Sequence, residues 1–170
     1  MIDALRALYT DPGFPSLHVL VIHFPIALLT LAPLFDIGCM VLRDRVWLDR
    51  AAAALYVMGS IGAGVAYLTG ERAAATAGEI APAAESALAD HENIAFLTLM
   101  ALAVVTLVRV GVTWLARHDR KVTIGALRLA AIPITLAGLL MLAITADRGG
   151  RLVYHYGVGV SPQNVGTLER

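Results

Sequence analysis

The sequence has 170 residues, of which 58% are hydrophobic and 15% charged, and its mean hydropathy is +0.73. A soluble domain is about half apolar and one quarter charged, so this composition argues against a disordered chain or an ordinary soluble enzyme. The formal net charge is zero, so no basic field exists to attract nucleic acid. The single cysteine, Cys39, provides neither a disulfide framework nor a cysteine-based zinc site. These features predict a small polytopic membrane protein.

Four apolar segments are long enough to cross a bilayer, whose hydrocarbon core is about 30 Å thick. They cover residues 17–42, 51–69, 94–116 and 127–146. The runs are unbroken rather than alternating and are rich in Leu and Ala, so we expect helices rather than strands. We predict an all-α fold in which residues 1–170 form one membrane domain, an up-down bundle of four transmembrane helices. A long external loop at 70–93 and an external C-terminal segment at 147–170 complete it.

Basic residues near the helix ends favour an orientation with both termini outside. The connections after the first and third spans, with the adjoining helix ends, carry Arg43, Arg45, Arg50, Arg117, Arg120, Lys121 and Arg128. The opposite side carries Arg6, Arg72, Arg148, Arg151 and Arg170. Because cytoplasmic loops hold the excess of Lys and Arg, we predict that the two short connections lie in the cytoplasm.

Four of the five histidines fall at one end of the predicted bundle. His18 and His23 begin the first span, His91 precedes the third, and His155 follows the fourth. Ionisable groups in a membrane protein mark a functional site by default, and histidine is the commonest metal ligand. His18 and His23 are about 140° apart around a helix, so they should face different partners. His118 lies on the opposite connection and is expected to be solvated.

Haem b is the metal centre that these histidines favour. It needs one or two axial histidines and a slot between helices. Small residues of the second span allow a helix or a flat cofactor to approach closely; they are Gly59, Ser60, Gly62, Ala63, Gly64 and Ala66. Five aromatic residues are placed to line such a slot: Phe24, Tyr67, Phe96, Tyr154 and Tyr156. We expect one or two haems, with His23 and His91 as the first axial pair and His18 and His155 as the second.

Two other functions remain open at this point. The same histidines could bind zinc or copper together with nearby carboxylates; the candidates are Glu71, Asp90, Glu92 and Asp147. The chain could also be a non-catalytic accessory subunit of a larger membrane complex, or a homo-oligomer. No CxxCH motif is present, which excludes covalent c-type haem, and no Ser-His-Asp or Walker pattern supports hydrolase or nucleotide chemistry.

Asp36 and Arg109 are the charged residues that lie well inside the predicted spans. Asp36 precedes Arg43 by seven residues and Arg109 precedes Arg117 by eight, so their depths match. An unpaired charge in hydrocarbon costs several kcal/mol. We therefore predict a structural ion pair between them, with a proton path or a quinone site as the sharper alternative.

Several blocks resemble a bacterial membrane family known as domain of unknown function 2231. The blocks are LHVLVIHFPIALL at 17–29, GVAYLTGERA at 64–73, His91, and GGRLVYHYGVGV at 149–160. Family members commonly have His-Pro at the first histidine, where here Val19 follows His18. The resemblance implies a four-helix protein of the bacterial inner membrane, whose relatives sometimes accompany Rieske iron–sulfur or cytochrome modules. Such company favours haem and electron transfer with a quinone or a redox protein as partner.

Overall fold

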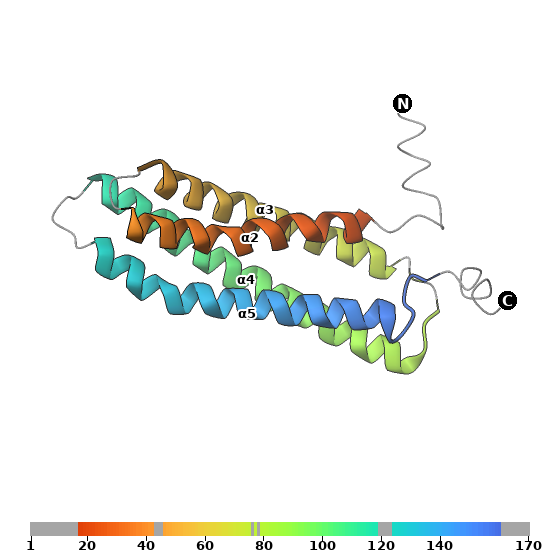
Figure 1. Cartoon of the computed structure of the whole chain (residues 1–170). Coiled ribbons are helices and arrows are strands. Elements are labelled where there is room, and N and C mark those ends of the chain that lie inside the picture. The colour runs from red at the N-terminus through yellow and green to blue at the C-terminus, as the bar shows by residue number, and fades with distance from the viewer. Residues whose placement is uncertain (1–16, 43–45, 76, 78, 119–123, 161–170) are drawn as a thin grey trace, which may run out of the picture.

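The structure is a computed structural model that describes residues 17–42, 46–75, 77, 79–118 and 124–160. Among these residues the fold is all-α and contains no strand. The helices are α2 (Leu17–Val41), α3 (Val46–Ala75), α4 (Pro82–His118) and α5 (Ile124–Tyr154), and they run alternately up and down (Figure 1). The predicted four-helix bundle is confirmed. The side of the membrane on which each end lies stays a prediction.

All four helices are long and apolar enough to cross a membrane. The shortest candidate span has 25 residues, which corresponds to about 38 Å of helix at 1.5 Å per residue. Large apolar side chains point outward on every helix; Leu34, Ile61, Leu107 and Leu140 are each at least 60% exposed. Soluble monomers rarely expose apolar surface on this scale. These faces are therefore the ones that contact lipid.

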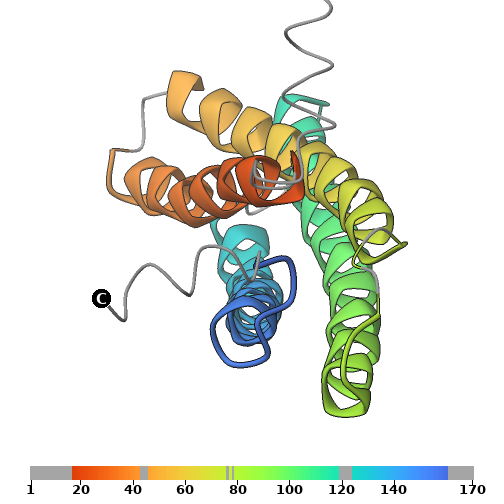
Figure 2. The same ribbon diagram turned by 90° about the vertical axis from the view of Figure 1, so that its right-hand side faces the viewer.

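The bundle consists of two helix hairpins, α2–α3 and α4–α5, which Figure 2 shows from one end. Each hairpin packs closely along its length, and α3 packs on α4 to join the two hairpins. In contrast, α2 and α5 approach each other only over a short stretch. The fully packed core lies between α2, α3 and α4; its members are Leu29, Ala32, Tyr56, Leu102 and Val105. The side between α2 and α5, which we call the α2–α5 seam, is the loosely packed side of the bundle.

The small residues of α3 serve helix packing. A Cβ atom added at Gly59 would lie 2.6 Å from Cγ of Leu29, and one added at Gly62 would lie 3.1 Å from Cδ1 of Phe24. Helix α2 therefore fills the face of α3 that these glycines open. The expectation that this face forms a cofactor slot is wrong at these two positions, because small residues in a membrane bundle also let two backbones approach closely.

Gly59 provides a test of this packing. Gly59→Ala should lower the free energy of unfolding by about 1–3 kcal/mol, because its methyl group would overlap the fully buried Leu29 side chain. Gly64→Ala is the matched control, since nothing lies within 4 Å of its added Cβ atom. Because alanine has a higher helix propensity than glycine, Gly64→Ala should leave the free energy of unfolding unchanged or raise it. Equal unfolding curves for the two variants in detergent micelles would contradict the packing.

The helices extend beyond the predicted spans at the end where α2 begins. The predicted external loop at 70–93 is mostly helical: α3 continues to Ala75 and α4 already begins at Pro82. This segment is rich in alanine, the strongest helix former, and proline is favoured in the first turn of a helix. Helix α5 likewise runs through Gly149 and Gly150 to Tyr154, so residues 147–154 of the predicted C-terminal segment are helical. The chain turns after Tyr154, and φ is positive at Gly157 (+69°) and at Gly159 (+77°).

Candidate functional site

Two of the predicted histidines lie inside the bundle at what we call the histidine end. This end comprises the start of α2, the end of α3, the N-terminal third of α4 and the end of α5. His18 comes from α2 and His91 from α4, and both side chains are partly buried. The two rings are close enough to interact electrostatically. The up-down topology thus places one partly buried histidine from each hairpin at the same end of the bundle.

His18 is held by the last turns of α3. Its Nδ1 atom lies 2.9 Å from the carbonyl oxygen of Ala66 and 3.4 Å from Oγ1 of Thr69. A carbonyl oxygen only accepts hydrogen bonds, so Nδ1 carries the proton and donates to Ala66. The neutral ring then presents Nε2 as an unprotonated nitrogen, which is the form that binds a metal.

His91 has a buried ring nitrogen without a hydrogen-bond partner among the described residues, its Nδ1 atom. An unpaired buried polar atom costs about 1–3 kcal/mol, and such an atom in a native structure calls for an explanation. The ring is held against the backbone of α5, because a Cβ atom at Gly149 would lie only 3.0 Å from its Cε1 atom. A symmetrical arrangement occurs at His18, whose Cε1 atom would lie 3.0 Å from a Cβ atom at Gly70.

His23 and His155 lie apart from this pair. His23 is exposed, and its Nδ1 atom is 2.7 Å from the carbonyl oxygen of Val19 in the same helix. His155 is also exposed and packs edge-on against Tyr156, with the ring centroids 4.8 Å apart. His18 rather than His23 therefore approaches His91. Since His18 and His23 lie about 140° apart on α2, only one of them can face α3. The fifth histidine, His118, ends α4, and its side chain lies outside the described residues.

The carboxylates proposed for a zinc or copper site do not join the histidines. All four, Glu71, Asp90, Glu92 and Asp147, are exposed. Asp147 instead pairs with Arg151 one turn further along α5, at 3.0 Å. Among the described residues no group of three or more His, Cys, Asp or Glu side chains is placed to hold a metal ion. Of the five predicted aromatic residues, Tyr67 and Phe96 pack against each other with their centroids 6.1 Å apart.

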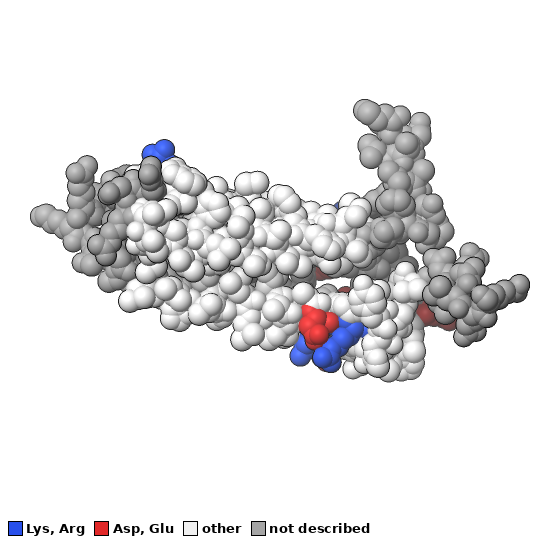
Figure 3. Space-filling model, viewed as in Figure 1, with Lys and Arg blue, Asp and Glu red and all other residues white. Residues whose placement is uncertain are grey.

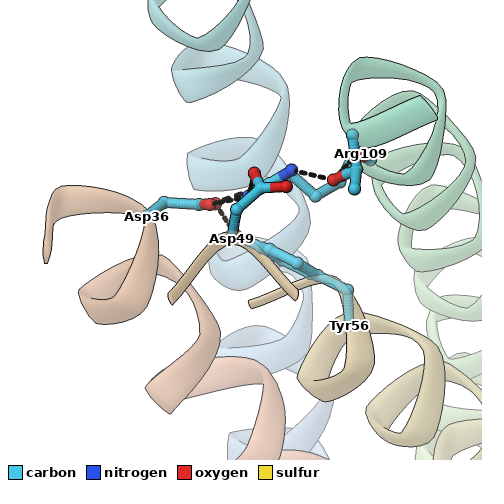
Figure 4. A network of polar contacts seen from close by, with 5 residues as sticks. Asp36, Asp49, Tyr56 and Arg109 are labelled. Atoms are coloured by element: carbon cyan, nitrogen blue, oxygen red, sulfur yellow. Dashed lines mark hydrogen bonds and ion pairs between the residues drawn. The ribbon is translucent and has the colours of Figure 1, made fainter. Parts of the chain in front are cut away.

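Asp36 and Arg109, which the sequence predicts to pair, form an ion pair in the other half of the bundle (Figure 4). Nε of Arg109 donates to Oδ1 of Asp36 at 2.6 Å, and Nη2 donates to Oδ1 of Asp49 at 2.9 Å. The third nitrogen, Nη1, donates to Oγ1 of Thr113 at 2.6 Å. The hydroxyl of Tyr56 donates to Oδ2 of Asp36 at 3.0 Å. The guanidinium of Arg109 therefore donates hydrogen bonds to three side chains, one each from α2, α3 and α4.

Sequence reasoning missed Asp49, Tyr56 and Thr113 as members of this network. Asp49 stands two residues before the predicted second span, beside Arg50, and so resembles an ordinary loop charge. The longer helix α3 places it in its first turn, where it is 8% exposed. Thr113 was detectable in principle, because it follows Arg109 by four residues and so shares its helix face.

A bundle of four apolar helices with buried charges defines a polytopic integral membrane protein. The family model described as predicted membrane protein (DUF2231) matches residues 14–162. This match covers most of the chain, and the chain belongs to this family. No curated protein and no solved structure matches the sequence.

Proposed function

We propose that this protein binds haem b at the histidine end and serves electron transfer in the bacterial inner membrane. The observation that carries the proposal is the pair His18 and His91. They come from different hairpins, lie within electrostatic range of each other, and are both partly buried. Bis-histidine ligation between helices is an established way to hold haem iron in a protein.

The residues around the pair fit such a group. The hydrogen bond from His18 to Ala66 fixes the tautomer that leaves Nε2 for a metal, and the unpaired Nδ1 of His91 lacks a protein partner among the described residues. Gly70 and Gly149 give the two rings room against the neighbouring backbones. Figure 3 shows a hollow between the hairpins toward this end of the molecule. A flat, apolar macrocycle suits a site that opens on the lipid side of a bundle.

In this proposal His18 and His91 are the residues that would hold one haem per chain. The group would supply one-electron redox chemistry, and two axial histidines would favour electron transfer over oxygen chemistry. The protein supports this by orienting both imidazoles, His18 through its hydrogen bond to Ala66 and His91 through its contact with the backbone of α5 at Gly149. His23 is exposed on α2 and His155 is exposed in the turn that follows α5, so they carry no second centre here. The partners required are a membrane quinol or redox protein and an acceptor.

The test is a reduced-minus-oxidised visible spectrum of the protein purified from membranes. We expect the sharp α and β bands of low-spin haem at one haem per chain. His18→Ala and His91→Ala should each lower the haem content at least about tenfold, because loss of even a residue that only orients a ligand costs about 10–100-fold in affinity at other metal sites. His23→Ala and His155→Ala are the matched controls and should retain the wild-type content. A colourless protein with stoichiometric zinc or copper would overturn the proposal in favour of a metal-ion site.

A further inference from the structure

A second site lies in the half of the bundle opposite the histidine end. There the α2–α5 seam opens into a pocket of about 130 Å³. Eighteen residues of α2 separate His18 from Asp36 at this pocket, which corresponds to about 27 Å along the helix. The pocket is therefore distinct from the proposed haem site, and what it binds can be argued independently of haem.

The pocket has an apolar rim and a polar floor. At the rim, Ile37 of α2 and Leu136 of α5 are 56% and 59% exposed, so the mouth opens where the helices contact lipid. At the floor lie Asp36, Tyr56 and Arg109, and Thr135 of α5 also contributes a hydroxyl to the lining. A ligand that enters here must dissolve in the bilayer and must carry a polar head.

The size of the pocket limits that head to about one ring. A buried cavity of about 150 Å³ is sufficient to hold benzene. The pocket is close to this volume. A six-membered ring therefore fits inside, while an attached apolar tail can extend through the rim along the lipid-facing sides of α2 and α5.

The hydrogen-bonding groups at the floor of the pocket determine which polar group the ring of the ligand must carry. Arg109 is 3% exposed and directs its donors to Asp36, Asp49 and Thr113. The side chain of Asp36 keeps 21% exposure, although it already accepts from Arg109 and Tyr56. A carboxylate has about four acceptor positions, so Asp36 can accept another hydrogen bond. An acyl chain in the pocket would cover the exposed part of this carboxylate without supplying a further donor, at a desolvation cost.

We propose that this pocket binds the head group of a membrane-soluble hydroquinone, with a ring hydroxyl donating to Asp36. The ring lies among the apolar side chains between α2 and α5, and the hydroxyl meets the exposed part of the carboxylate. Thr135, whose side chain also hydrogen-bonds Tyr56, lines the α5 side of the same pocket. The tail leaves through the opening beside Ile37 and Leu136. This assignment stands whether or not the histidine end holds haem.

The proposal is tested by calorimetric titration of the full chain in lipid nanodiscs with a short-tailed hydroquinone under anaerobic conditions. We expect saturable binding at one equivalent. The dimethyl ether of the same compound keeps the ring and tail but has no hydroxyl donor. It should bind at least about tenfold more weakly, because a hydrogen bond to a charged group is worth about 1.5–3 kcal/mol. Equal binding of the two compounds would mean that the pocket takes any apolar chain, and would overturn the proposal.

Two neighbouring alanines of α5 provide matched variants. Ala131 lines the pocket and is 8% exposed, whereas Ala130 is exposed outside it. Ala131→Leu should fill the pocket and weaken hydroquinone binding at least about tenfold. Ala130→Leu should bind as the wild type does. Unchanged binding in Ala131→Leu, with a wild-type circular dichroism spectrum, would overturn the site. The haem spectrum of Ala131→Leu should equal that of the wild type. Loss of hydroquinone binding at the pocket and loss of haem at the histidine end can therefore be distinguished.

Discussion

Arg109→Met is expected to lower the free energy of unfolding by about 3–5 kcal/mol. The substitution keeps a long, unbranched side chain but removes the guanidinium that contacts both Asp36 and Asp49. The side chain of Arg109 is 3% exposed and that of Asp36 is 21% exposed. Removal of one partner from such a pair leaves the other charge buried without compensation, and this cost exceeds the net value of the pair itself. Unfolding by SDS in mixed micelles measures the loss.

Arg151→Met is the matched control for this experiment. Arg151 also pairs with an aspartate, but its side chain is 68% exposed and that of Asp147 is 61% exposed. Exposed ion pairs contribute about 0–1 kcal/mol, so we expect a change within that range. A wild-type unfolding curve for Arg109→Met would contradict the structural role of the network.

A double-mutant cycle separates pairing from burial. Asp36→Asn in the Arg109→Met background removes one of the two uncompensated carboxylates and should recover part of the lost stability. Exchange of the two charges, Asp36→Arg with Arg109→Asp, should likewise recover part of it if the two residues act chiefly on each other. If Asp36→Asn instead adds its own full cost to that of Arg109→Met, Asp36 and Arg109 are not coupled.

The fold was predictable from the sequence because of the length of its apolar runs. In lipid every backbone group must be bonded within its own segment, so a run such as 17–42 has helix as its only simple outcome. The helix ends were less predictable, since hydropathy marks where a helix leaves the hydrocarbon and not where it stops. Residues 82–93 and 147–154 were expected outside the spans, yet they lie within α4 and α5.

The rotation of each helix could not be read from the sequence. In a soluble helix the apolar stripe identifies the buried face, but lipid is as apolar as a protein core, so α2 carries apolar residues all round. The sequence therefore predicted that His18, His23, His91 and His155 share one end, and not that His18 and His91 face inward. The ion pair between Asp36 and Arg109 was predictable, because a charged side chain inside the hydrocarbon is stabilised mainly by an opposite charge at the same depth.

In the proposed haem site, Gly149→Val is expected to lower the haem content at least about tenfold while the helices remain intact. A Cβ atom added at this position would lie 3.0 Å from Cε1 of His91, and the two methyl groups that valine adds to it would displace the ring. A ligand displaced by about 1 Å loses much of its bond to a metal, because coordination distances tolerate only about 0.2 Å. The haem-to-protein ratio from the absorption spectrum measures this effect.

Gly150→Val separates displacement of the ring from a general effect of valine in α5. No atom lies within 4 Å of a Cβ atom added at Gly150. Gly150→Val and Gly149→Val change the intrinsic helix propensity of α5 by the same amount. We expect it to retain wild-type haem and a wild-type circular dichroism spectrum. If Gly149→Val retains haem as well, the contact with α5 at Gly149 does not position His91 in the proposed haem site. If both variants lose haem together with helix content, the loss reports damage to α5 and not the position of one imidazole.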